Sequence, residues 1–321
     1  MIVVRSIEEF PPGLPSPVVT IGNFDGVHRG HREIFRRVRE LAASREGTSV
    51  VITFEPHPLT VVTSARHISL ITTAAEKEAL IGSAGIDCLL VIPFTPEFAR
   101  ISAQEFVAGV LVSRIGVKQL IIGYDYAFGR NREGGTALLG RLGREYGFEV
   151  EVLSPIGEAG HIFSSSEIRR LVRNGEVSRV VPLLGRYFSL EGRVVHGRHR
   201  GKSLGFPTAN VVTDHDLIPA DGVYAVKVDL GGVIYGGAGN IGTNPTFGGG
   251  ERGIEIFLFE YDGDLYGRKL RIFFIEQLRA EVAFPDADAL RHAISADVAR
   301  CREIVKGVTI TDGASGTVEV M

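Results

Sequence analysis

The first half of the chain alternates short apolar runs with amphipathic helical patterns. The apolar runs lie at residues 18–21, 49–54, 88–92, 119–122 and 149–153. The first helical pattern starts near Arg29, and its apolar side chains form one stripe: Ile34, Phe35, Val38, Leu41 and Ala42. Strands that alternate with helices in this way predict β-α-β units and a parallel sheet.

The pattern changes after about Leu184. Short β-branched and aromatic runs, separated by glycines, follow at residues 188–196, 222–230, 233–239, 254–261 and 270–275. Gly231-Gly232 and Asp262-Gly263 are predicted hairpin turns between such runs. Strands this closely spaced, with no helix between them, predict an antiparallel barrel or sandwich. A last helical pattern at residues 285–305 should pack onto that barrel.

This change of pattern predicts two domains of different fold class, α/β and then all-β. We place the α/β domain at residues 1–184, the β-barrel domain with its terminal helix at residues 185–307, and a tail at residues 308–321. A chain of 321 residues is long enough for two packed cores. Several helix starts carry the capping-box pattern, at Thr73-x-x-Glu76, Ser102-x-x-Glu105 and Ser164-x-x-Glu167.

Composition narrows the function classes. The formal net charge is −3 and the pI is near 6.3, so no overall basic field favours nucleic-acid binding. No apolar run reaches the roughly 18 residues of a membrane span, and the start lacks the pattern of a signal peptide. The two cysteines, Cys88 and Cys301, are far apart in apolar runs, which predicts buried thiols. A reducing cytoplasm fits this pattern.

The segment at residues 22–31 is the first candidate site, since it follows a predicted strand and opens a predicted helix. Backbone amides at a helix start favour phosphate. His28 and His31 can donate to phosphate oxygens, and Gly30 lets a nucleotide approach the backbone. Two solvated histidines are the alternative. The candidate phosphate contacts in this segment are Gly22, Phe24, Asp25 and Gly30.

A second phosphate-type segment lies at residues 163–169. Ser164 and Ser165 place hydroxyls at a helix start and Arg169 follows just inside the helix, which suits a departing pyrophosphate. A plain capping box with a solvated charge is the alternative. His57 and Asp125 follow predicted strands, where open α/β sheets bind ligands, although loop capping would explain both equally well.

The glycine-rich basic segment at residues 197–203 resembles a P-loop only superficially. Three residues separate its glycines where the Walker pattern needs four, and no helix can follow. A phosphate-binding loop of another kind would use Gly197, Lys202 and Gly205, whereas a solvated basic hairpin would need none of them.

Thr208 and Asn210 are a candidate metal pair. They lie two residues apart in an extended segment, so both side chains project to one side and can share Mg²⁺. Glu255 lies between Ile254 and Ile256, so it faces opposite to them. If the isoleucines point outward, Glu255 points into the barrel.

Taken together, these motifs resemble those of the bacterial bifunctional riboflavin kinase/FMN adenylyltransferases. Residues 22–31 look like a HIGH signature, and residues 163–169 resemble the family's I-S-S-T-x-I-R segment with Ser166 in place of Thr. The kinase pattern is covered by five segments, at residues 207–210, 222–226, 240–247, 254–256 and 278–281. Tyr124, Tyr126-Ala127 and Ile256-Phe257 depart from the family pattern.

The resemblance implies a Rossmann-like nucleotidyltransferase domain followed by a riboflavin kinase barrel. It places magnesium on Thr208 and Asn210, the catalytic carboxylate on Glu255, and stabilisation of the α-phosphate on the two histidines. Asn240 and Arg279 are further expected flavin contacts. The expected ligands are riboflavin, FMN, FAD, ATP and Mg²⁺. A kinase with a degenerate first domain and, less favoured by charge, a nucleic-acid-binding module are the alternatives.

Overall fold

The computed structural model describes residues 1–63, 68–158, 161–196, 205–243 and 252–310. These residues form two compact units. The first unit comprises Met1–Ile68 and Ala74–Ser164, and the second comprises Ser69–Thr73 and Ser165–Met321. Residues 165–184, which the sequence assigned to the first domain, are therefore grouped with the barrel in the structure.

The first unit contains a six-stranded sheet in which every neighbouring pair of strands is parallel. The strand order is β1-β4-β3-β2-β5-β6. The strands are β1 (Ile2–Val4), β2 (Val18–Ile21), β3 (Ser49–Glu55), β4 (Cys88–Pro93), β5 (Gln119–Gly123) and β6 (Glu149–Leu153). The parallel α/β fold predicted from the alternating pattern is confirmed, and only β1 was not predicted.

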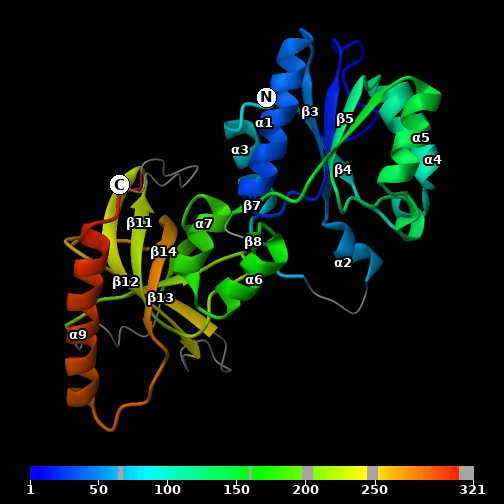
Figure 1. The fold of residues 1–321 in the computed structure, drawn as a ribbon. Helices are drawn as coiled ribbons and strands as arrows, with labels where there is room; N and C mark the ends of the chain where they lie inside the picture. The colour runs from blue at the N-terminus through cyan, green and yellow to red at the C-terminus, as the bar shows by residue number, and fades with distance from the viewer. Residues whose placement is uncertain (64–67, 159–160, 197–204, 244–251, 311–321) are drawn as a thin grey trace. The chain divides into compact units, whose positions relative to one another are not determined.

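Helices cover both faces of this sheet (Figure 1). They are α1 (Arg29–Ser44), α3 (Ala74–Ser83), α4 (Ala103–Glu105), the π-helix η2 (Phe106–Ile115) and α5 (Thr136–Tyr146). The short helix α2 (Pro58–Val62) follows β3 and has no buried residue. Short elements complete the unit: η1 (Phe98–Arg100), η3 (Arg130–Arg132), β7 (Gly157–Glu158) and β8 (His161–Ile162). The predicted capping box at Ser102 and Glu105 is present at the start of α4.

The side chains that α1 buries are those of the apolar stripe predicted from the sequence. Phe35, Val38 and Ala42 are buried against the sheet, and Ile34 and Leu41 pack at the edge of the same face. The carboxyl ends of β2, β3 and β5 all meet at one edge of the sheet, where a parallel sheet binds its ligands.

The second unit is built on a closed six-stranded antiparallel barrel of order β10-β13-β12-β11-β14-β9. Its strands are β9 (Phe188–Val195), β10 (Ala209–Val212), β11 (Gly222–Leu230), β12 (Val233–Thr243), β13 (Arg252–Leu258) and β14 (Lys269–Arg279). The helical elements of the unit are α6 (Ser165–Arg173), η4 (Val177–Val180), α7 (Val181–Leu184) and α9 (Ala287–Lys306). The predicted barrel and terminal helix are confirmed.

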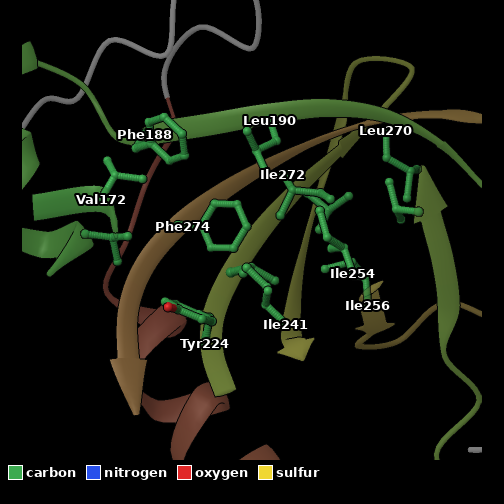
Figure 2. Packing of buried hydrophobic residues seen from close by; sticks show 14 of the residues in the cluster. Val172, Phe188, Leu190, Tyr224, Ile241, Ile254, Ile256, Leu270, Ile272 and Phe274 are labelled. Atoms are coloured by element: carbon green, nitrogen blue, oxygen red, sulfur yellow. The ribbon is translucent and has the colours of Figure 1, made fainter. Parts of the chain in front are cut away.

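The barrel interior is apolar, and one alternate set of side chains from each strand fills it (Figure 2). Ile254 and Ile256 belong to this interior, together with Val211 of β10 and Ile241 of β12. Because side chains alternate along a strand, Glu255 projects from the outer face of the barrel. The sequence left the direction of Glu255 open, and the condition for an inward Glu255, outward-pointing isoleucines, is not met because both isoleucines fill the interior.

Helix α9 covers part of the outer face. Cys301 and Val305 pack there against Ala225 and Phe273, and Leu290, near the start of the helix, is only half-buried. Among the described residues, no helix combines the length and hydrophobicity needed to cross a membrane.

The two predicted hairpin turns had different outcomes. Gly231 and Gly232 join β11 to β12 with φ values of +66° and +92°, which is the left-handed backbone that such a turn needs. Asp262-Gly263 is no hairpin turn, because β13 and β14 are not neighbours in the barrel. β13 pairs with β10 and β12, so residues 259–268 form a longer connection to β14.

Candidate active sites

The loop between β2 and α1 has a constrained backbone. Phe24 and Val27 have φ values of +49° and +39°, a region that non-glycine residues rarely occupy. Asp25 and His28 are buried although both are polar. Strained non-glycine residues persist only where the surrounding structure fixes them, and they cluster at functional sites.

His28 is the N-cap of α1. Its Nδ1 accepts the backbone N–H of His31 at 3.3 Å. Because Nδ1 supplies a lone pair to this bond, a neutral His28 carries its proton on Nε2. The two imidazole rings are stacked, with 3.5 Å between centroids and 20° between planes. Phe24 contacts the His31 ring edge-on at 5.2 Å, so both rings are held by packing as well as by the helix start.

Gly22 and Gly30 leave room for neighbouring side chains of this loop. A Cβ at Gly22 would lie 2.8 Å from Cζ of Phe24, and one at Gly30 would lie 3.1 Å from the His28 ring. The two glycines therefore let the Phe24 and His28 rings pack directly against the backbone of the loop. Gly30 also approaches Phe163, because a Cβ at Gly30 would lie 3.5 Å from the Cβ of Phe163.

The segment after β8 returns to the start of α1. The Arg29 guanidinium lies 5.0 Å from the centroid of the Phe163 ring and forms an ion pair with Glu158. Ser164, the next residue, is therefore brought near the histidine loop within the first unit. Ser165 and Arg169 lie on α6 of the second unit, where Arg169 is buried and its Nε donates to the Ser69 carbonyl oxygen at 3.0 Å.

His57 and Asp125 lie at the carboxyl ends of β3 and β5. His57 is buried and caps α2, since its Nδ1 accepts the backbone N–H of Leu59 at 3.2 Å. Asp125 is exposed, and its Oδ1 would lie 3.3 Å from a Cβ at Gly123. The capping role that the sequence left open for His57 is thus present, and Asp125 remains accessible to a ligand.

Sequence reasoning missed an aromatic cluster at the same sheet edge. Its members follow or flank the ends of different strands, and neighbouring rings lie between 5.5 and 6.1 Å apart. They are Phe54, Phe94, Phe98, Phe106, Tyr126 and Phe128. Burial raises the pKa of the Tyr126 phenol. The sequence does show aromatic residues at the ends of three predicted strands. It does not show that these strands are neighbours, so it could not predict that the rings form one cluster.

The barrel carries the second constellation on its outer face. Asn210 of β10 and Asn240 of β12 are the direct cross-strand partners of Glu255 on β13, one on each side. The Thr208 hydroxyl donates to Oε2 of Glu255 at 3.4 Å. The four predicted residues Thr208, Asn210, Asn240 and Glu255 therefore lie together.

Asn210 is the residue in this group that most clearly fits a metal. Its side chain is buried, yet none of the residues that the structure describes donates a hydrogen bond to its Oδ1. A buried amide oxygen without a donor is costly unless another electropositive partner is supplied. Oxygen donors from Thr208 and Asn210 suit Mg²⁺, which takes a few protein oxygens together with phosphates and water. No group of three or more His, Cys, Asp or Glu side chains that could hold a metal occurs in the described part of the chain.

The remaining predicted residues had mixed outcomes. Gly197 and Lys202 lie outside the described residues, whereas Gly205 is described with a φ of +87°. Arg279 makes a bidentate ion pair with Asp297 of α9, with contacts of 2.7 to 3.2 Å, and lies over the Phe284 ring. In this structure its guanidinium anchors α9.

Comparisons with known proteins match both halves of the chain. A family model described as FAD synthetase matches residues 12–167, and one described as riboflavin kinase matches residues 184–305. A bifunctional riboflavin kinase/FMN adenylyltransferase from Pseudomonas fluorescens is 39% identical over 308 residues, covering 95% of this chain and 98% of the relative. The Escherichia coli K12 protein of that name is 38% identical over 287 residues, covering 89% and 92%.

A solved structure is similar over almost the full length. It is a crystal structure described as a macrolide-efflux protein from Streptococcus pneumoniae, with a TM-score of 0.84 and 31% sequence identity. The match covers 96% of this chain and 99% of that one. The name belongs to that protein, and the similarity to this chain is one of fold and sequence.

Proposed function

Because the chain belongs to the bifunctional riboflavin kinase/FMN adenylyltransferase family, we propose that its two activities use the two constellations described above, one in each unit. The enzyme phosphorylates riboflavin with ATP to give FMN and ADP. It then transfers the adenylyl group of a second ATP to FMN, which gives FAD and pyrophosphate.

In the kinase step, Glu255 is the general base. The 5′-hydroxyl of riboflavin is a poor nucleophile near neutral pH, so it needs a carboxylate to accept its proton as the oxygen attacks the γ-phosphorus. The hydrogen bond from Thr208 fixes one oxygen of the Glu255 carboxylate. ADP leaves as the new phosphate ester bond forms.

Thr208 and Asn210 would hold Mg²⁺ beside this base. The bound ion would neutralise charge on the β- and γ-phosphates of ATP. The supporting observation is the buried Oδ1 of Asn210, to which no donor in the described part of the chain is bonded. Gly197, Lys202 and Gly205 would complete the phosphate site from the preceding segment.

In the adenylyl-transfer step, His28 and His31 are donors to the α-phosphate. FMN already carries an anionic phosphate at pH 7, so an oxygen of that phosphate can attack the α-phosphorus of ATP without a base. The negative charge that grows on the α-phosphate needs donors held in place beforehand. The hydrogen bond from the His31 backbone N–H holds the His28 ring, and stacking between the two imidazoles holds the His31 ring. Gly22, Phe24, Asp25, Gly30 and Ser164, all of the first unit, shape this phosphate site.

The aromatic cluster of the first unit would bind the isoalloxazine ring of FMN. Phe54, Tyr126 and Phe128 are half-buried at the carboxyl edge of the sheet, and aromatic rings stack well on a planar flavin. His57 and Asp125 flank that edge. We place the enzyme in the cytoplasm, where the two buried cysteines, both free thiols, would stay reduced.

The observation that carries the kinase assignment is the Thr208–Glu255–Asn210 arrangement, and a matched pair of variants tests it. Glu255→Gln should lower the rate of FMN formation by about 10²- to 10⁴-fold, because the amide cannot accept the proton. Glu260→Gln changes an exposed carboxylate that forms an ion pair with Arg302, and it should leave that rate unchanged. A rate near wild type for Glu255→Gln would remove Glu255 as the base.

A further inference from the structure

The outer face of β12 and β13 changes character in three steps along the strands. The first step is apolar, because Ala238 and its partner Phe257 pack beneath α9. The next step is the pair of Asn240 and Glu255. The third step is a pair of glycines, Gly242 opposite Gly253, so that this part of the strand surface carries no side chain of its own. A bare patch of backbone therefore directly follows the proposed catalytic base.

The side chain of Glu281 lies over this patch. A Cβ at Gly242 would be 2.3 Å from Oε1 and 2.6 Å from Cδ of Glu281, so the carboxylate occupies the space that any larger residue would fill. Glu281 is exposed to solvent. Over the ranges that the structure describes, no hydrogen bond or ion pair ends on its carboxylate. The oxygens are free to accept hydrogen bonds from a ligand.

The segment that carries Glu281 is anchored two residues earlier. Arg279, the last residue of β14, forms its bidentate ion pair with Asp297 of α9 and lies over the Phe284 ring. The chain between β14 and α9 is thus held at both ends, and the position of Glu281 over Gly242 is a consequence of this anchoring. Such anchoring makes a carboxylate suitable for recognising a substrate.

The placement relative to Glu255 suggests what Glu281 recognises. Gly242 lies two residues, or about 7 Å, along β12 from the cross-strand partner of Glu255. An extended polyol chain can span that distance. Thr208 and Asn210 lie on the opposite side of Glu255, on β10, so the phosphates and the metal would approach from there. A carboxylate repels phosphate but is a strong acceptor for hydroxyl groups.

We propose that Glu281 is a specificity-determining residue of the kinase site, and that its carboxylate accepts hydrogen bonds from the secondary hydroxyls of the ribityl chain. Riboflavin would lie along β12, with its 5′-hydroxyl at Glu255 and its inner hydroxyls at Glu281. Gly242 keeps open the space that the carboxylate needs. This inference rests on the proposed role of Glu255, and the experiment below separates the two.

The test compares two substrates in the full-length enzyme. One is riboflavin, and the other is a flavin with a 10-(5-hydroxypentyl) chain, which keeps the terminal hydroxyl but lacks the three inner ones. Wild type should prefer riboflavin in kcat/KM. Glu281→Ala should lower kcat/KM for riboflavin by about tenfold to hundredfold, the effect of losing hydrogen bonds to a charged acceptor, and leave the analogue unchanged.

Gly242→Ala provides a second route to the same result. The backbone at Gly242 lies outside the left-handed region, so it accepts an alanine. The new methyl group would meet the flexible end of Glu281, and the carboxylate can move away while the strand stays intact. This variant should also lose its preference for riboflavin. Because both changes act through one carboxylate, the double variant should be no worse than the worse single variant. Glu276→Ala, which removes an exposed carboxylate of β14, is the matched control.

Each outcome decides the proposal. An equal fall in kcat/KM for both substrates, an unchanged value for riboflavin, or a wild-type enzyme that does not distinguish the substrates would overturn the role of Glu281. FAD formation from supplied FMN reports on the first unit and should stay constant in every variant. Failure of the Glu255 assignment would look different, since Glu255→Gln would then phosphorylate both flavins at the wild-type rate.

Discussion

Asn210 and Glu255 are directly opposite each other on β10 and β13, and both side chains are on the outer face of the barrel. The carboxylate accepts a hydrogen bond from Thr208, while the buried amide oxygen of Asn210 has no donor within the described ranges. Metal-dependent phosphoryl transfer to a hydroxyl group uses a base for the hydroxyl proton and an oxygen ligand for the metal. Glu255 and the Asn210 amide oxygen would supply these two groups side by side. The barrel supplies both from its backbone register, because neighbouring strands fix which residues meet.

Asn210→Leu keeps the approximate volume of the side chain and removes the amide oxygen. We expect the free Mg²⁺ concentration for half-maximal kinase rate to rise at least about tenfold, because one protein ligand is lost. Burial of an apolar residue at this site should not destabilise the barrel, since the unsatisfied oxygen is removed as well. Kinase rates measured across a magnesium titration check this. An unchanged magnesium dependence would exclude Asn210 as a ligand.

Gly30→Ala tests how tightly the histidine loop is packed. The new Cβ would lie 3.1 Å from the His28 ring, so the ring must shift by a few tenths of an ångström. We expect FAD formation from FMN to fall about tenfold or more, because misplaced donors lose transition-state stabilisation. Gly140→Ala is the control, since a Cβ in that position of α5 meets nothing within 4 Å. Equal rates for the two variants would contradict the proposed role of the His28 ring.

The two cysteines should not react in the folded protein. Burial raises the pKa of the Cys88 thiol to about 11 and that of the Cys301 thiol to about 12. Since the thiolate is the reactive form, a raised pKa lowers reactivity at pH 8, where an unperturbed thiol is partly ionised. Labelling with a disulfide reagent at pH 8 should therefore be negligible in native protein and reach both cysteines in urea. Rapid labelling of the native chain would show that one thiol is accessible.

The boundary of the barrel unit can be tested with two fragments. Six residues that precede residue 185 belong to the barrel core: Ile168, Leu171, Val172, Val177, Val180 and Leu184. Burial of each is worth about 1.5–3 kcal/mol, so together they match the whole stability of a typical domain. A fragment of residues 165–321 should phosphorylate riboflavin by itself, because Ile71 is the one buried residue of the described barrel core that it lacks. Residues 185–321 should unfold at a lower temperature or fail to fold, as measured by circular dichroism.

If the two fragments are equally stable and equally active, the packing of residues 165–184 on the barrel does not matter for the kinase. In that case the boundary after residue 184, which the change in hydrophobic pattern predicts, would be the functional one.

Periodicity was enough to predict most of the fold. Alternation of β-type runs and helical stripes identified β2 to β6 and α1 in the first unit. β2 to β5 and α1 bury continuous apolar faces, whereas the edge strand β6 has no fully buried residue. β1 was missed since only Val4 of its three residues is buried. The connection at Asp262-Gly263 was misread because turn residues mark a turn without saying which strands it joins.

The sites were less predictable, because sheet order decides which residues meet. Thr208, Asn210 and Glu255 came from the sequence motif, but their position on the outer face depends on which way Ile254 points, and alternation alone leaves two choices. The aromatic cluster was missed for the same reason, since Phe54 and Phe128 are far apart in the sequence and are connected through the rings of Phe98 and Phe106. The contact of Glu281 with Gly242 has no sequence signature at all.

The central claim is that the two activities use separate sites, and the products of two variants test it in one chromatographic assay. With riboflavin, ATP and Mg²⁺, His28→Ala should accumulate FMN at the wild-type rate and form FAD about 10²- to 10³-fold more slowly. With FMN supplied, Glu255→Gln should form FAD at the wild-type rate although it makes almost no FMN from riboflavin. Equal loss of both products in either variant would contradict the account.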